Sequence, residues 1–174
     1  MSQSGHVPAT LEAFMQQALQ MELEAAQRYT EFADMMEVHN NREVSAWFRR
    51  MAEVEGKHAA HIMAQMGWRE VPSQPGGAPL LAGLEAVEGD AGDELHYLMQ
   101  PWHVLQLALA SEERAERFFA QLARAATDES VRQAACALQQ EEHDHVELVK
   151  AWLLKVPQPD AGWDQDPDPP RYDD

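Results

Sequence analysis

The chain contains four stretches in which apolar residues recur at alternating steps of three and four, the spacing of the buried face of a helix in a bundle. This pattern predicts helices over about residues 9–38, 41–66, 101–126 and 128–156. Together they predict an all-α fold, a four-helix bundle that occupies residues 9–156 as one domain. The chain length of 174 residues and its 45 % hydrophobic content are sufficient for such a core.

The connections between the predicted helices differ in length and composition. Asn40, followed three residues later by Glu43, predicts the N-cap of the second helix, and Gly67 predicts its end. Residues 67–100 are rich in proline and glycine and are too long for a tight turn. We therefore expect two helical hairpins joined by a long crossover, which lets the second and third helices run parallel. Pro101 suits the first turn of the third helix.

The two ends of the chain lack this periodicity. Residues 1–8 predict a flexible leader, and residues 157–174, rich in aspartate and proline, predict a flexible acidic tail. The N-terminus shows no basic stretch followed by an apolar run, and no stretch approaches the roughly 18 apolar residues of a membrane span. We therefore expect neither a signal peptide nor a membrane segment, and we expect a cytoplasmic location.

Polar residues interrupt the apolar faces of all four helices. Six of them occupy positions where an apolar residue is expected: Glu22, Glu55, His58, Glu112, Glu142 and His145. The second and fourth helices each carry a glutamate with a histidine three residues later, and the first and third helices each carry a single glutamate. Burying a lone carboxylate is strongly unfavourable unless it is paired or bound to a metal.

The two halves of the chain repeat this pattern. The segment from Glu22 to Tyr29 is similar to the segment from Glu112 to Phe119, at an offset of 90 residues (112 − 22). The two Glu-x-x-His pairs are offset by 87 residues (142 − 55). The repeat indicates a duplicated helical hairpin, with the crossover joining the two copies.

The six residues have the chemistry of a dinuclear metal site. Residues three apart lie on one helix face, with about 5–6 Å between their Cβ atoms, so each Glu-x-x-His pair can bind one ion while its glutamate reaches a second. Four carboxylates offset the charge of two divalent cations, and mixed carboxylate and imidazole ligands suit iron or manganese better than zinc. Dinuclear carboxylate bundles use this ligand pattern. The alternative is a bundle with buried ion pairs, although these faces carry no Lys or Arg.

The composition excludes several other classes of protein. A single cysteine, Cys136, excludes an intrachain disulfide framework, a four-cysteine zinc site and a cysteine-ligated iron–sulfur cluster, and we expect it to pack as a small apolar residue. The net charge of −17 argues against binding to a nucleic-acid backbone. The glutamates beside the buried faces, including Glu141, are expected to be solvated.

At these positions the sequence resembles the rubrerythrin branch of the ferritin-like superfamily, over about residues 10–155. The resemblance rests on four motifs: Glu22 with Tyr29 seven residues later, Glu55-x-x-His58, Glu112 followed by Phe118-Phe119, and Glu142-x-x-His145. It implies a ferritin-like bundle that holds two iron ions, or manganese or a mixed pair in their place.

Carried over by position, the resemblance also implies a role for each residue. It makes Glu55 and Glu142 the ligands that bridge the two metals. Each remaining glutamate would complete one end together with a histidine: Glu22 with His58, and Glu112 with His145. The spacing alone leaves open which histidine joins which of these glutamates. Tyr29 would orient a ligand or take part in electron transfer, or it is a core tyrosine with a satisfied hydroxyl.

The resemblance implies an oxidoreductase that reduces H2O2 or O2 in oxidative-stress defence, as a homodimer. Rubrerythrins proper carry a rubredoxin domain with a four-cysteine iron site; with one cysteine here, an external donor protein would supply the electrons. The family's extra carboxylate on the third helix is replaced by Ala115, which weakens the expectation of peroxide reduction. The alternatives are a ferroxidase with Fe(II) as substrate, oxygenation of an organic substrate, and a metal-stabilised interaction module with a docking tail.

Overall fold

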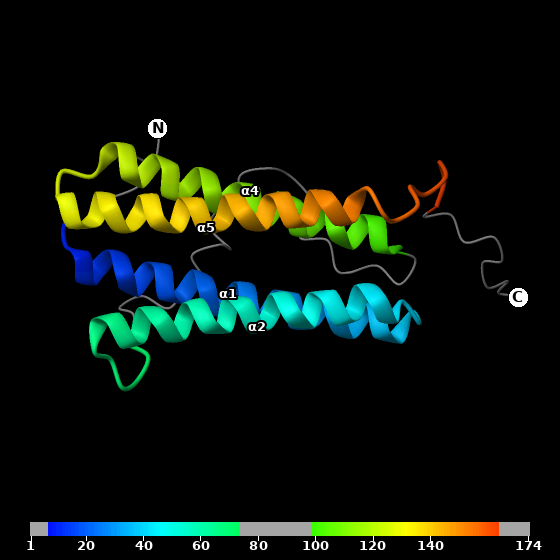
Figure 1. The fold of residues 1–174 in the computed structure, drawn as a ribbon, viewed down its shortest axis with the longest axis horizontal. Coiled ribbons are helices and arrows are strands. Elements are labelled where there is room, and N and C mark those ends of the chain that lie inside the picture. Colours follow the sequence, from blue (N-terminus) through cyan, green and yellow to red (C-terminus); the bar gives the residue numbers. More distant parts are fainter. Residues whose placement is uncertain (1–6, 74–98, 164–174) are drawn as a thin grey trace, which may run out of the picture.

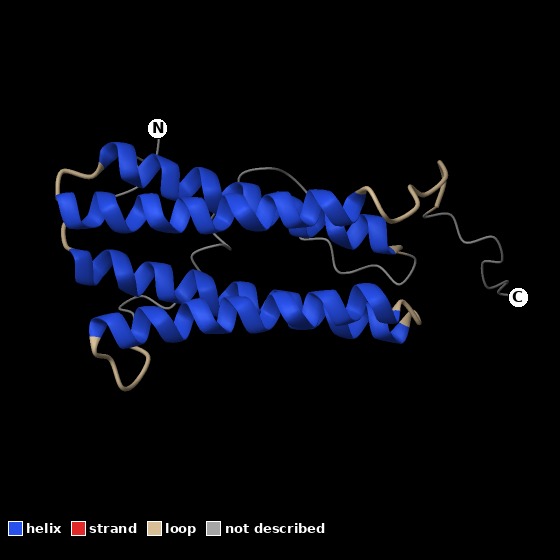
Figure 2. Cartoon of the chain, in the orientation of Figure 1, coloured by secondary structure: helices blue, strands red, loops and turns tan. Residues whose placement is uncertain are grey.

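The computed structural model describes residues 7–73 and 99–163, which form two helical hairpins lying side by side (Figure 1). Within these ranges the regular structure consists of four long helices and includes no strand (Figure 2). The helices are α1 (Leu11–Val38), α2 (Arg42–Met66), α4 (Pro101–Ala125) and α5 (Glu129–Leu153). This confirms the predicted all-α four-helix bundle.

The segments outside these helices are described only in part. The predicted leader (1–8), crossover (67–100) and acidic tail (157–174) lie largely outside the described residues. In the described part of the tail, the Trp163 ring packs against His103 of α4, with 3.7 Å between the ring centroids and 36° between the ring planes. The end of the chain that the structure describes therefore lies against the third helix of the bundle.

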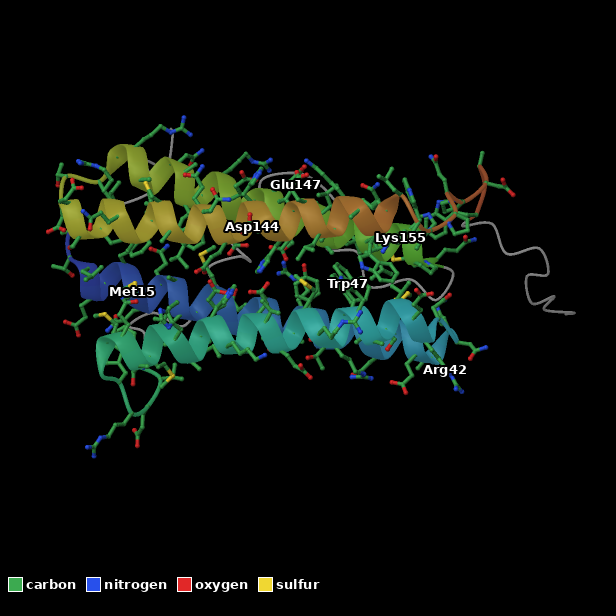
Figure 3. All side chains as sticks on the ribbon, in the orientation of Figure 1. Met15, Arg42, Trp47, Asp144, Glu147 and Lys155 are labelled. Atoms are coloured by element: carbon green, nitrogen blue, oxygen red, sulfur yellow. The ribbon has the colours of Figure 1, made fainter. Side chains whose placement is uncertain are left out.

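The helices pair as the repeat in the sequence predicts. α1 packs against α2, and α4 packs against α5, each pair forming an antiparallel hairpin (Figure 1). α2 and α4 run in the same direction, as the long connection between them predicts. The two hairpins face each other through their side chains, so residues on these facing surfaces decide what lies at the centre of the molecule (Figure 3).

The helix ends follow local sequence, with one correction. Thr10 accepts a hydrogen bond from the Ala13 amide at 3.2 Å and so caps α1. The predicted N-cap at Asn40 is wrong, because α2 begins after Asn41. Asn40 instead has a left-handed φ of 61°, a conformation that asparagine tolerates better than most residues and that turns the chain away from the end of α1.

The apolar core is divided into two clusters by the polar residues of the helix faces. One cluster includes Phe14 of α1 and Phe119 of α4, whose rings meet edge to face with centroids 6.1 Å apart. The other includes Trp47 of α2, which lies between the hairpins (Figure 3). The ring centroids of Trp47 and Trp152 of α5 are 5.5 Å apart. Burial of these aromatic side chains holds the hairpins together on both sides of a central polar layer.

Gly67 offers a test of how the second helix ends. Its φ of 70° is left-handed, and a Cβ built there meets no atom within 4 Å. Gly67→Ala should therefore destabilise the protein by about 1 kcal/mol through backbone conformation alone. Gly56→Ala is the matched control, because Gly56 lies inside α2 with equally free space, and the change should stabilise by up to about 1 kcal/mol. Urea denaturation of both variants measures the difference, and a stabilising Gly67→Ala would contradict this account.

Candidate metal centre

The central polar layer is formed by the six residues that interrupt the apolar faces. Each helix contributes at the same level of the bundle: Glu22 from α1, Glu55 and His58 from α2, Glu112 from α4, and Glu142 and His145 from α5. All are buried except His58, whose side chain is 24 % exposed. The apolar clusters on either side therefore enclose four carboxylates and two imidazoles.

One end of this layer is built around His145. Its Nδ1 lies 3.6 Å from Glu112 Oε2 and 3.7 Å from Glu142 Oε2. Donor atoms of Glu112, Glu142 and His145 all lie within 4.8 Å of one another, and the three residues are buried. We call this group the inner position, because little solvent reaches it.

The other end is built around His58. Its Nδ1 lies 3.6 Å from Glu22 Oε2 and 3.7 Å from Glu141 Oε2. Donor atoms of Glu22, His58 and Glu141 also lie within 4.8 Å of one another. We call this group the outer position. The two groups answer the question that spacing left open, because Glu22 lies with His58, and Glu112 lies with His145.

Glu55 lies between the two ends. Its Oε1 is 3.1 Å from Nδ1 of His145, and its Oε2 is 3.5 Å from Nδ1 of His58. The two imidazole rings are nearly parallel, with 3° between their planes and 5.3 Å between their centroids. One carboxylate thus faces both positions with different oxygens, which is the arrangement of a ligand that bridges two ions.

The buried oxygens of this layer are short of hydrogen bonds. Both oxygens of Glu22 and both of Glu55 lack a hydrogen-bond partner, as do Nδ1 of His58 and Nδ1 of His145. The 3.1 Å contact between Glu55 and His145 is close enough for an ion pair, but the atoms are not aligned for a hydrogen bond. Buried polar groups without partners are rare in native proteins. Unpartnered carboxylate oxygens and imidazole nitrogens converging on one space fit a pair of bound divalent cations.

The burial of several carboxylates close together shifts the pKa values of the residues in this layer. Burial, with Glu55 nearby, raises the pKa of Glu22 to about 8 despite the opposing contact with His58. Burial also raises the pKa of Glu142 well above its usual range, and the negative charges of Glu112 and Glu22 add to this. The contacts with Glu22 and Glu55 raise the pKa of His58 to about 10. Without cations the site would hold protons in their place.

Glu55, the glutamate between the two ends, behaves differently. Burial opposes ionisation of Glu55, but its contacts with His145 and His58 outweigh burial and hold the pKa of Glu55 at about 2. Burial likewise opposes the charge on His145, yet the surrounding carboxylates outweigh it and raise the pKa of His145 far above its usual value. The carboxylate that faces both positions is thus the one that the surroundings keep ionised and able to bind cations.

Tyr29 is the residue that distinguishes the two ends. Its hydroxyl donates a hydrogen bond to Oε1 of Glu112, across the interface between the hairpins. Burial beside Glu112 raises the pKa of Tyr29 well above its usual value, so the hydroxyl keeps its proton. At the equivalent place in the repeat, Phe119 has no hydroxyl to offer Glu22. The resemblance implies either ligand orientation or electron transfer for Tyr29, and the hydrogen bond to Glu112 fits ligand orientation.

The structure adds a contact to one expectation for residues beside the buried faces and corrects another. Glu141, expected to be solvated, has a side chain that is 43 % exposed, but its carboxylate also lies beside His58, because Glu141 stands next to Glu142 at the edge of the buried face. Its position three residues after Leu138, which is buried, was the available indication. Cys136, expected to be packed, is exposed. It lies one residue past Ala135 on the solvent side of α5.

A pocket connects the outer position with solvent. It has a volume of about 440 Å³ and is lined by α1, α2 and α5 residues, including Met15, Lys57, His58, Ala137 and Glu141. His58 contributes to both the pocket and the polar layer, whereas His145 is only 5 % exposed. The two ends of the site therefore differ in access to solvent as well as in their hydrogen bonds.

The comparisons with known proteins agree with this fold and this site. The sequence profile of the Rubrerythrin family matches residues 13–153. A solved structure of an uncharacterized conserved protein from Magnetospirillum magnetotacticum is similar, with 33 % sequence identity and a TM-score of 0.71. The match covers 87 % of this chain and 99 % of that one. No curated protein is significantly similar in sequence.

The chain is therefore a ferritin-like four-helix bundle of the class that holds carboxylate-rich metal sites, and it belongs to the rubrerythrin family. Proteins of this family bind a di-iron site, and the buried groups of glutamate and histidine described above are candidate ligands for metal ions in this chain. None of the described helices is long and apolar enough to cross a membrane.

Burial of Glu22 should lower the stability of the metal-free protein at neutral pH, because its raised pKa of about 8 means that a carboxylate ionised in the unfolded chain must take up a proton on folding. Glu22→Gln keeps the shape of the side chain without an ionisable group, so it should stabilise the metal-free protein at pH 7 by about 1–3 kcal/mol. Urea denaturation in the presence of a chelator measures this. Glu31→Gln, on the exposed face of the same helix, is the control and should change stability by less than about 0.5 kcal/mol. A less stable Glu22→Gln would show that this carboxylate is well compensated without metal.

Proposed function

We propose that this protein is a non-haem di-iron oxidoreductase that reduces H2O2 or O2 with electrons from an external donor protein. The observation that carries the proposal is the group of buried, unpartnered carboxylate oxygens of Glu22 and Glu55 that faces the two imidazoles. Membership of the rubrerythrin family supports iron as the metal, with manganese or a mixed pair as the other candidates.

The residues that would hold the two ions follow from the two groups of contacts. His145 and Glu112 would bind one ion at the inner position. His58 and Glu22 would bind the other ion at the outer position. Glu55 faces both positions, and Glu142 lies close enough to the glutamates of both ends for their charges to affect its pKa. Four carboxylates and two neutral imidazoles would balance the charge of two divalent cations.

The protein would contribute positioning and a dry environment. When bound, a reduced iron pair can supply two electrons and polarise the O–O bond of a peroxide. With two protons, those electrons reduce one H2O2 to two waters, and an electron-donor protein would restore the reduced pair. The apolar clusters around Phe119 and Trp47 exclude water from both sides of the polar layer. Tyr29 would hold Glu112 in place during the reaction.

A metal titration combined with two oxidants tests the proposal. The purified protein should bind about two Fe(II) ions per chain under anaerobic conditions. Rapid oxidation by H2O2, with slow reaction with O2, is the result expected of a peroxidase, measured by stopped-flow absorbance. Glu55→Ala and Glu142→Ala should each lose the dinuclear spectrum, whereas Glu147→Ala, an exposed change on α5, should keep it. Full two-ion occupancy in both site variants would contradict the assignment.

A ferroxidase is the second candidate, in which Fe(II) is the substrate. The pocket that opens onto His58 and Glu141 favours it, because it gives cations a route to the outer position, and the net charge of −17 attracts them. Rapid reaction with O2 and turnover of many Fe(II) ions per chain would identify this activity. Reaction with neither oxidant would favour the metal-stabilised interaction module. The homodimer and the cytoplasmic location stay predictions.

Tyr29→Phe tests the role of the hydroxyl on Glu112. The change removes one hydrogen bond and little volume, so the protein should still bind about two ions. We expect roughly a tenfold slower reaction with the preferred oxidant, because partners that orient metal ligands typically contribute 10–100-fold to affinity or activity. Stopped-flow rates at matched iron content measure this. An unchanged rate would leave Tyr29 as a core residue only.

A further inference from the structure

We propose that Glu141, the third residue of the outer position, is a carboxylate ligand of the ion there, together with Glu22 and His58. This inference rests on the proposed function, because it concerns one of the two ions of that site. It concerns a residue outside the two Glu-x-x-His pairs and the two single glutamates that predicted the site. Glu141 comes from α5, so it would reach the ion from the hairpin opposite to Glu22 and His58.

The distances support ligation. Glu141 Oε2 lies 3.7 Å from Nδ1 of His58, almost the same distance as Glu22 Oε2 at 3.6 Å. Donor atoms of all three residues lie within 4.8 Å of one another. Ligand bonds of about 2.0–2.2 Å place donor atoms on opposite sides of an ion about 4 Å apart, so small side-chain movements bring the three onto one cation.

A second observation, the lack of hydrogen-bond partners in this group, points to a bound cation. Glu22 is 2 % exposed, and neither of its oxygens has a hydrogen-bond partner, although it faces His58 and the space beside Glu141. Nδ1 of His58 also has no hydrogen-bond partner. A solvated surface glutamate would not explain these buried atoms, whereas a cation held by all three residues would satisfy them together.

The repeat in the sequence shows that Glu141 is specific to one end. Its counterpart in the first hairpin is residue 54 (141 − 87), which is Val54 and cannot bind a metal. The inner position around His145 therefore has no equivalent ligand, but it has the hydroxyl of Tyr29 on Glu112 instead. Each end of the duplicated site thus has one feature that the other lacks.

The exposure of Glu141 indicates how the ligand would act. Its side chain is 43 % exposed and lines the pocket that reaches His58. A ligand that is half in solvent can move off an ion and return without opening the bundle. We therefore expect the outer position to load and release metal through this pocket, with Glu141 as the first carboxylate that an entering cation meets.

Binding of Co(II) to the full-length protein tests this ligand. Co(II) is a suitable probe because its visible absorption reports the number of ligands at each ion. Glu141→Gln should leave one of two binding steps unchanged and weaken the other by about 10–100-fold, with a changed spectrum for the weakened ion. Glu141→Asp keeps the charge but shortens the side chain, and it should also weaken that step. Glu147→Gln removes the same charge from an exposed place on α5 and should bind like the wild type (Figure 3).

The outcomes separate this inference from the proposed function. A wild-type protein that binds fewer than two Co(II) ions contradicts the dinuclear site and the inference with it. A wild type that binds two, with Glu141→Gln unchanged, contradicts the inference alone. If Glu141→Asp binds like the wild type while Glu141→Gln is weakened, the residue acts through its charge, and ligation is also refuted.

Discussion

The central constraint in this molecule is the burial of four carboxylates between two helical hairpins. Glu22 and Glu55 are almost fully buried, and none of their oxygens has a hydrogen-bond partner. Charges of this kind are tolerated in a protein interior only when they are compensated. Apolar clusters on both sides of this layer exclude water from it. Two histidines place their Nδ1 atoms beside the carboxylates. A pair of divalent cations would satisfy the constraint with the residues present.

The duplication that built the site has not left it symmetric. Glu112 receives a hydrogen bond from Tyr29, whereas the residue equivalent to Tyr29 in the second hairpin is Phe119. The end of the site around His58 opens to a pocket, whereas the end around His145 is closed. Two ions in such a site would differ in ligand mobility and in solvent access. A closed position suits an ion that stays bound, and an open one suits the ion at which exchange takes place.

The sequence predicted the fold and the composition of the polar layer because both depend on periodicity. A glutamate or histidine at a step of three or four on an apolar face is directed into the bundle, so periodicity alone predicts the burial of Glu55 and His145. Contacts between hairpins are not periodic. The proximity of Glu141 to His58 depends on the rotation of α5 against α2, which spacing along one helix does not specify. The predicted N-cap at Asn40 is wrong for a local reason, because asparagine suits both the start of a helix and a left-handed turn.

The candidate metal ligands would also help to hold the two hairpins together. The inner position takes His145 and its neighbours from the second hairpin, but it also contacts Glu55 of the first. The outer position takes His58 from the first hairpin, and Glu141 approaches from the second. Cations at either position would therefore join the hairpins through ligands from both. Metal binding and docking of the hairpins would then be one equilibrium, because carboxyl groups that take up protons in the metal-free protein would become ligands that connect its two halves.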